Sequence, residues 1–433
     1  MKMLHRRVLG FTTGVIAIGA IALGAAFAQT PTQTIKVMGW WGTLGVFKGG
    51  WEFTMKEFER QNPGVKIEYT ATAYDQTLNQ IMASTLANNA PDMIQVSAVW
   101  FEQLKAANAL EPLDKYIPSD ELKLFPPQLL EEARLGGSLY GVPQAPGPIM
   151  MIYNKDLLQE AGLNPNEPPK TWAALTEAIR KVCALPPRAN GKVYGVALRT
   201  ERNPLSAMWS IPVIWAVGGN ITDSAGRLDV TSPAAVTAYS WYRDVTRSGC
   251  NPEGATVSEG RTIFGQRRAG FIFEGPWSRG IFQQISGGKL KMTPDGNIWV
   301  APMPAGPDGK VRLLANHNYI AMTQQSANKE LTAKLIRFMV GNTLVAEEVY
   351  KASDMLSTGR LDLLKSGSQA SDKYGQVFVT YLNDTNAVPI RNARWAAGMD
   401  AVSASMQRII QGADPASELA EAQREARRVM GTQ

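Results

Sequence analysis

Tryptophans in predicted loops are the side chains with the clearest capacity for chemistry in this chain, which has eleven of them among 433 residues. Several directly follow predicted strands, where open α/β sheets bind their ligands. A tryptophan ring presents a rigid apolar face with negative charge density, which suits the weakly positive C–H face of a sugar. Such rings could equally fill a core, so both interpretations stay open. The tryptophans in question are Trp40, Trp41, Trp100, Trp277 and Trp395.

Polar residues lie beside aromatic residues at two places in the chain. Glu274 lies three residues before Trp277, and His317 and Asn318 precede Tyr319. Their side chains can exchange hydrogen bonds with hydroxyl groups while a neighbouring ring stacks on the apolar face. The combination indicates binding of a polyhydroxylated molecule.

Catalytic templates are absent from the sequence. We find no nucleophile elbow, phosphate-binding loop, zinc-binding helix or Cys-x-x-Cys, and the glycine-rich stretch 39–50 does not match a dinucleotide fingerprint. The two histidines, His5 and His317, offer little material for a metal site. We therefore expect no cofactor, no metal and no enzyme activity. A secreted glycosidase is a remote alternative, because the two carboxylates it needs can come from distant parts of a chain.

The N-terminus is typical of a secretory signal. Lys2, Arg6 and Arg7 precede an apolar run over 8–27, and Ala26-Phe27-Ala28 is a small-x-small exit. Residues 1–28 are thus predicted to be a signal peptide cleaved after Ala28. A retained anchor is the alternative, but no basic cluster follows the run. The prediction is a soluble periplasmic protein.

The remaining composition excludes some partners and leaves one question open. The net charge of +6 would fall to +3 after loss of three basic signal residues, so we expect no nucleic-acid partner. No second apolar stretch reaches membrane-spanning length.

Cys183 and Cys250 are the only cysteines. An oxidising compartment permits one disulfide, but sequence does not show whether these two come within reach of each other.

Alternating strands and helices form the first part of the chain. Strands are predicted at 34–38, 65–70 and 93–96, with helices at 51–61 and 74–89 between them. This order implies parallel strands with helical crossovers, hence an open α/β sheet.

A second stretch repeats this theme. Strands are predicted at 149–153, 194–198 and 269–273, with a helix starting near Trp172 after the N-cap Thr171. No low-complexity linker separates the two stretches. The chain is therefore expected to cross between domains through ordered segments.

A set of motifs then resembles a known family, the extracellular solute-binding proteins of ATP-binding-cassette importers, in the branch with maltose-binding and glycerol-3-phosphate-binding proteins. The motifs are Tyr140–Pro143, Ile152–Leu158, Ala161–Leu163, Pro168–Trp172 and Phe264–Trp277. The resemblance implies a two-lobed α/β periplasmic-binding-protein fold, in which each lobe is an open sheet flanked by helices and the ligand lies between the lobes. It places 30–145 and 302–345 in an N-terminal lobe and 150–298 and 350–433 in a C-terminal lobe, with hinges near 144–149 and 300–304.

The resemblance also implies site residues. Trp277 matches a stacking tryptophan, Trp395 matches a second stacking aromatic, and Trp40 and Trp41 fall in the first cleft loop. Three features depart from the relatives. The first cleft loop has two tryptophans and a threonine where polar or charged groups often contact the ligand, Trp100 falls at a charged pair of maltose-binding proteins, and Gly147 falls at an acidic residue. These departures disfavour maltose itself and predict a more aromatic cleft. The further ligand-binding candidates are Tyr74, Glu274, Gly275, His317, Asn318 and Arg391.

The resulting hypothesis is a monomeric carbohydrate receptor that delivers its ligand to the integral-membrane permease subunits of an importer. A receptor for an anionic solute such as glycerol 3-phosphate is the alternative, in which Arg391, Arg394 and His317 would bind the anion.

Overall fold

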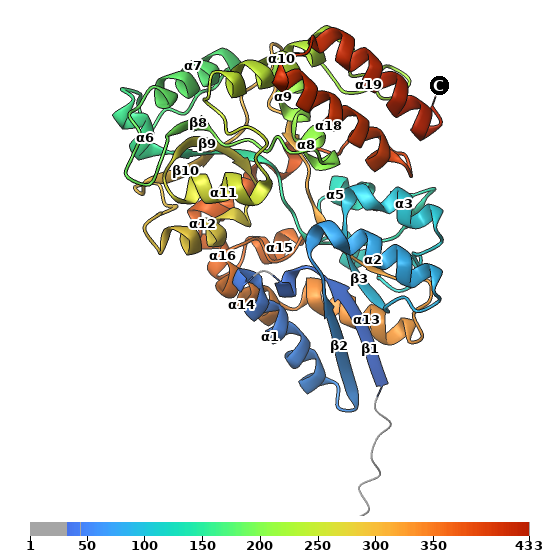
Figure 1. The fold of residues 1–433 in the computed structure, drawn as a ribbon. Coiled ribbons are helices and arrows are strands. Elements are labelled where there is room, and N and C mark those ends of the chain that lie inside the picture. The colour runs from blue at the N-terminus through green and yellow to red at the C-terminus, as the bar shows by residue number, and fades with distance from the viewer. Residues whose placement is uncertain (1–32, 44, 433) are drawn as a thin grey trace, which may run out of the picture.

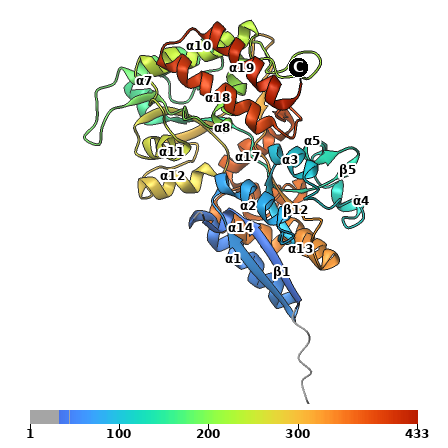
Figure 2. The ribbon, with the colours of Figure 1, turned by 45° about the vertical axis from the view of Figure 1, so that its right-hand side comes forward.

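Two β-sheets organise the computed structural model, which describes residues 33–43 and 45–432. They lie at opposite ends of the molecule, each with its own helices (Figures 1 and 2). The predicted signal peptide and its cleavage site lie outside the described residues. Among those described, no helix is both long and apolar enough to cross a membrane.

The first sheet has five strands in the order β2-β1-β3-β12-β6. Strand β1 pairs in parallel with β2 and β3, whereas β12 is antiparallel to both β3 and β6. Helices α1 (Gly45–Gln61) and α2 (Tyr74–Leu86) provide the crossovers between the parallel strands. The predicted α/β sheet is thus confirmed, with a late strand inserted in it. The strands are β1 (Gln33–Gly39), β2 (Val65–Ala71), β3 (Met93–Ser97), β6 (Val142–Ala145) and β12 (Asn318–Met322).

The second sheet has four strands in the order β10-β7-β9-β8. Strand β9 pairs in parallel with β8 and antiparallel to β7, and every residue of β7 and β9 is buried. Continuous apolar runs of this kind are typical of strands covered on both faces. The strands are β7 (Met150–Asn154), β8 (Tyr194–Val196), β9 (Ala269–Glu274) and β10 (Ile298–Ala301).

Further helices and the β4-β5 hairpin complete the part of the molecule around the first sheet. Helix α14 packs along α1 (Figure 1). The elements are η1 (Trp41–Thr43), η2 (Ala98–Trp100), α3 (Phe101–Ala106), α4 (Ser119–Leu122), α5 (Pro127–Glu132), β4 (Arg134–Leu135), β5 (Ser138–Leu139), α13 (Lys329–Gly341) and α14 (Thr343–Ser353).

Further helices complete the rest of the molecule: α7 packs on β8 and β9 of the second sheet, and the C-terminal pair α18 and α19 packs at that end (Figure 1). The predicted N-cap of α7 is confirmed, because the Thr171 hydroxyl accepts a hydrogen bond from the Ala174 amide. The elements are α6 (Lys155–Glu160), α7 (Trp172–Cys183), α8 (Pro204–Trp209), α9 (Ile211–Ala216), α10 (Pro233–Arg247), α11 (Val257–Gly265), α12 (Ser278–Ser286), α15 (Leu361–Leu364), α16 (Gly367–Ser371), α17 (Lys373–Thr380), η3 (Leu382–Asp384), α18 (Trp395–Gln411) and α19 (Pro415–Met430).

Paired crossing segments connect the two sheets. The Ile149 amide donates to Leu314 O at 2.9 Å, and the Asn316 amide donates to Gly147 O at 3.0 Å. A third segment joins them, since β11 (Leu313–Leu314) pairs in parallel with β13 (Thr385–Asn386). The crossings are therefore ordered backbone, as the lack of a linker predicts.

Contacts near two predicted lobe boundaries bear on the domain division. The Ala305 amide donates to Lys170 O, so the residues just after 302 lie against the part built on the second sheet. Helix α14 runs continuously through position 350 and packs on α1. Residues 300 and 301 of the predicted hinge 300–304 belong to β10. The hydrogen bonds that pair the crossing segments lie at 313–317.

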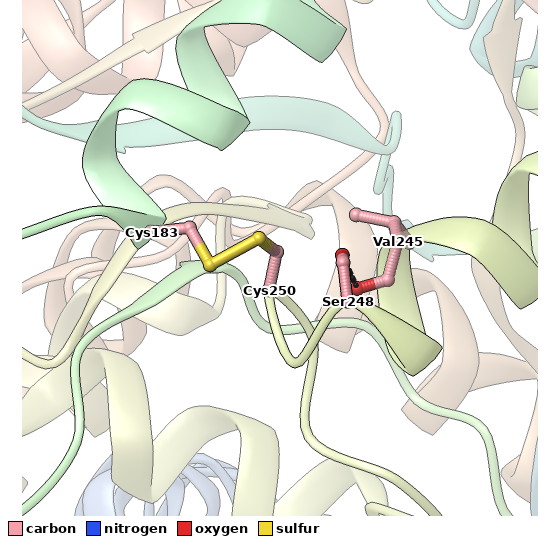
Figure 3. The surroundings of a disulfide bond; sticks show 4 residues. All are labelled: Cys183, Val245, Ser248 and Cys250. Carbon is pink, nitrogen blue, oxygen red and sulfur yellow. Dashed lines mark hydrogen bonds between the residues drawn. A yellow bond between two sulfur atoms is a disulfide. The ribbon is translucent and has the colours of Figure 1, made fainter.

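A disulfide joins Cys183, at the end of α7, to Cys250, which follows α10 (Figure 3). Their Cα atoms are 5.2 Å apart, which answers the question that the sequence left open. The carbonyl of Cys250 accepts hydrogen bonds from the amides of Gly195 and Val196 in β8. The bridge therefore ties two helices to the strand that leads into the cavity described next.

Candidate functional site

A cavity of about 490 Å³ lies between the ends of the two sheets. Its lining comes mainly from the loops that follow β1, β8 and β9, from helices α8 and α11, from the start of α2, and from the crossing segment at the start of β12. This is the place where open α/β sheets bind ligands. The residues that carry the argument below are Trp40, Trp41, Tyr74, Asp75, Arg199, Glu201, Trp209, Arg261, Trp277 and Asn318.

The loop after β1 is held by a buried glutamine. Gln95 Oε1 accepts hydrogen bonds from the amides of Trp40 at 2.8 Å and Trp41 at 3.2 Å, and Gln95 Nε2 donates to Gln144 Oε1. A Cβ at Gly39 would collide with the Gln95 side chain, so the close approach needs glycine. Both tryptophans line the cavity, as expected for a first cleft loop.

Three aromatic rings form a cluster at this wall. The ring centroids of Trp40, Tyr74 and Trp100 lie 5.1 to 5.5 Å apart in edge-to-face or tilted arrangements. Burial raises the pKa of Tyr74. Trp40 and Tyr74 line the cavity, whereas Trp100 is not among the lining residues and packs against both of them. We infer that Trp100 supports the wall from behind.

The opposite wall centres on Trp277, just beyond β9. Its indole Nε1 donates to Glu274 Oε2 at 2.8 Å, and Arg261 binds the same carboxylate through Nε at 2.6 Å and Nη2 at 3.1 Å. A Cβ at Gly147 or Gly275 would collide with the Trp277 ring. Glu274 therefore orients the ring, and the two glycines make room for it.

A second ion pair lines the same wall, and sequence reasoning missed it. Arg199 and Glu201 follow β8 and pair with each other, and the Arg199 guanidinium lies 5.5 Å from the centre of the Trp209 ring. Arg199 Nε also donates to Ser206 Oγ at 3.2 Å. Their place after a predicted strand is the one signal that could have identified them.

The crossing segment contributes two lining residues, Asn316 and Asn318, and one buried histidine. Asn318 lines the cavity at the start of β12. The His317 side chain is fully buried and its Nδ1 accepts a hydrogen bond from the Gly147 amide at 3.0 Å. Burial lowers the pKa of His317 to about 3, so the ring is neutral and holds the two crossing segments together.

A buried carboxyl group lies beside this histidine. Glu132 Oε1 is 3.6 Å from His317 Nε2, and Tyr319 Oη donates to Glu132 Oε2 at 3.0 Å. Burial raises the pKa of Glu132 to about 8, although the Tyr319 hydrogen bond and the Arg391 charge oppose the rise.

Two predicted site residues lie elsewhere. Arg391 donates to the carbonyls of Arg134 and Glu131, next to the C-terminal end of α5, and borders a separate cavity of about 40 Å³ that Glu132 also lines. Trp395 is buried at the first turn of α18 and is not among the lining residues. The structure thus brings together Trp40, Trp41, Tyr74, Trp277 and Asn318 around one cavity, with Trp100, Gly147, Glu274, Gly275 and His317 in a supporting layer.

The sequence and the fold both have recognisable relatives. The sequence profile of the bacterial extracellular solute-binding protein family matches residues 41–344. The maltotriose-binding protein of Pyrococcus abyssi is 26% identical over 276 residues, which are 63% of this chain and 55% of that protein. The sn-glycerol-3-phosphate-binding periplasmic protein of Brucella abortus is 28% identical over 269 residues, 58% of this chain and 59% of that protein.

A solved structure agrees over nearly the whole chain. The ABC transporter solute-binding protein from Thermotoga lettingae, bound with alpha-D-tagatose, superposes with a TM-score of 0.81 at 20% identity and covers 93% of this chain and 100% of its own. This likeness shows the two-lobed fold of periplasmic sugar-binding proteins. Since the family profile covers most of the chain, the protein belongs to the bacterial extracellular solute-binding proteins.

Proposed function

We propose that this protein captures a carbohydrate in the cavity between its two sheets and delivers it to the permease subunits of an ABC importer. One observation carries the proposal: aromatic rings beside both sheets line a single cavity, with Trp40 and Trp41 after β1, Trp277 after β9 and Trp209 on α8. Flat apolar rings on facing walls suit the apolar faces of sugar rings. The volume of about 490 Å³ falls in the range of small-molecule sites.

The relatives support this reading. One binds maltotriose by its name, and the structural relative holds tagatose. The chain offers hydroxyl partners beside the rings, among them Asn316 and Asn318 from the crossing segment.

The two lobes supply the movement that a receptor needs. Each lobe is built on one sheet, and the paired crossing segments around 147–149 and 313–317 form the hinge. Ligand contacts with both walls stabilise the closed form, which is the form that the permease recognises. Shifting the ratio of closed to open protein from 1:99 to 99:1 takes about 5.5 kcal/mol of differential binding.

Compartment, assembly and chemistry follow from the same proposal. The protein is a periplasmic monomer after cleavage at Ala28, and it releases its ligand unchanged. Mass spectrometry of the exported protein tests the cleavage site, and light scattering tests the assembly. Chromatography of a sugar after long incubation with the protein tests for turnover, which would support the glycosidase alternative.

The deciding experiment is a thermal-shift screen of the mature protein against mono- and oligosaccharides, with maltose, maltotriose and D-tagatose among them. We expect at least one sugar to raise the melting temperature, because a ligand that binds only the folded state stabilises it. Calorimetry then measures the affinity. A protein that responds to no sugar in the panel would contradict the proposal.

A further inference from the structure

The charged side chains of the cavity form matched pairs. The charged residues among its described lining are Asp75, Arg199, Glu201 and Arg261, and Glu274 lies directly behind Trp277. Arg199 pairs with Glu201, and Arg261 pairs with Glu274. The remaining group, Asp75, is exposed and negative. Every lining cation in the described part of the chain is therefore balanced by a carboxylate.

Burial makes this balance matter for the choice of ligand. The side chains of Arg199 and Glu201 are 8% and 17% exposed, and those of Arg261 and Glu274 are 19% and 3% exposed. Charge interactions are strong where water is excluded. An anion in the cavity would therefore be repelled by the two glutamates about as strongly as it is attracted by the two arginines. It would lose its hydration without gaining an unpaired cation in return.

The arginines can still serve an uncharged ligand. A guanidinium has five N–H donors, and the fork between Arg261 and Glu274 uses two of them. The others can donate to hydroxyl or ring oxygens of a sugar. The pairs thus offer directional hydrogen bonds without net charge.

We infer that Glu201 and Glu274 determine specificity by restricting the cavity to uncharged sugars and excluding phosphorylated or otherwise anionic solutes. The inference rests on the proposed function and narrows its ligand class. It also separates this protein from its glycerol-3-phosphate-binding relative, since discrimination can arise from charges placed against the wrong ligand.

The test measures affinities by calorimetry for the tightest sugar of the screen and for sn-glycerol 3-phosphate and glucose 6-phosphate. Each is measured at about 20 mM and about 200 mM NaCl, because salt screens charge contacts. The wild-type protein should bind the sugar with little salt dependence and the phosphates at least about a hundredfold more weakly. Wild-type protein that prefers a phosphate would overturn the inference.

Two variants make the cause specific. Glu201→Gln and Glu274→Gln each keep the side-chain shape and leave one arginine unbalanced, so affinity for the phosphates should rise by about tenfold or more and fall with salt. The matched control is Glu177→Gln, an exposed glutamate of α7 that pairs with Arg180 and should change neither affinity. Folded variants with unchanged phosphate affinity overturn the inference. If either variant fails to fold, the other variant and the wild-type comparison decide.

These outcomes are distinct from failure of the proposed function. A protein that binds no sugar contradicts the proposed function. A protein that binds a sugar, with phosphate affinity unchanged in both variants, contradicts only the role of the two glutamates.

Discussion

The two walls of the cavity are both aromatic, but they hold their rings by different means. On the first wall Trp40 packs edge-on against Tyr74 and Trp100, and the loop backbone is fixed by Gln95. On the second wall Trp277 has its indole fixed by the Glu274–Arg261 pair. The first wall is therefore an extension of the core, whereas the second is a ring held in place by charged side chains.

This difference separates stability from binding. Removing a ring from a packed cluster costs apolar contacts and leaves a cavity, whether or not ligand is present. Removing a ring that adjoins glycines and a polar clamp costs fewer such contacts. Replacing a tryptophan by alanine should thus reduce stability more on the first wall and reduce ligand affinity more on the second.

The largest expected effect is on the first wall. Trp40→Ala should lower the free energy of unfolding of the empty protein by about 3 kcal/mol, because the change opens the three-ring cluster. Urea unfolding followed by circular dichroism measures this loss. The control is Trp172→Ala, a half-buried ring on α7 that packs against Trp241 outside the cavity. A loss no larger than that of the control would contradict the idea that this wall is core.

On the second wall the main effect should be on binding. Trp277→Ala should weaken sugar affinity by at least about tenfold, or 1.4 kcal/mol, with a smaller loss of stability than Trp40→Ala. Titration calorimetry and urea unfolding of the same preparation check both parts. An unchanged calorimetric affinity would remove Trp277 from the site.

The polar cluster of Glu132, His317 and Tyr319 beside the crossing segments predicts a pH dependence. The pKa of Glu132 is raised to about 8, so between pH 6.5 and 8 the folded protein holds a proton that the unfolded chain has lost. Stability should therefore fall as pH rises, by about 1 kcal/mol per pH unit. His317 does not contribute in this window, because its lowered pKa leaves it neutral in both states above its ordinary value of 6.5.

Comparing variants isolates this contribution. Urea unfolding at pH 6.5 and 7.5 should show a shallower decline for Glu132→Gln than for the wild-type protein. Glu131→Gln, an exposed neighbour, should behave like wild type. Equal slopes in all three proteins would show that Glu132 does not carry the effect.

The smallest expected effect tests whether Gly275 makes room for the Trp277 ring. The three atoms nearest to a Cβ at Gly275 would be Trp277 ring atoms, so Gly275→Ala should displace the ring and weaken sugar binding by about fivefold, or 1 kcal/mol. In a Trp277→Ala background the same change should have no further effect on affinity. Gly260→Ala is the control, because its Cβ would make ordinary contacts. Additive losses in the double variant would mean that Gly275 acts independently of the ring.

Much of the fold follows from local pattern. Apolar runs predict β3, β7 and β9, and Thr171 predicts the start of α7. Helix α1 begins at Gly45, although its glycines favour a later start at 51. Gly50 lies against Val349 of α14, so tertiary packing stabilises the first turns of α1.

The site was predictable where a residue's place in a strand-end loop decides its role. Trp40, Trp41 and Trp277 follow strands and line the cavity. Arg261 and Trp209 were not identified, because they lie on helices and reach the cavity only through packing between elements. Arg391 was expected near ligand, but it donates to carbonyls next to α5, and no local pattern shows which carbonyls will be near.

The sequence by itself determined the two α/β halves, the ordered crossings and the aromatic strand-end loops, because periodicity and loop position are local properties of a chain. Only the tertiary structure decided that the Glu274 carboxylate accepts a hydrogen bond from the Trp277 indole and so orients the ring. It also decided that Cys183 is bonded to Cys250 and that each lining arginine has a carboxylate partner. These are relations between residues up to 67 positions apart, and their energies depend on distance and burial that no local pattern contains.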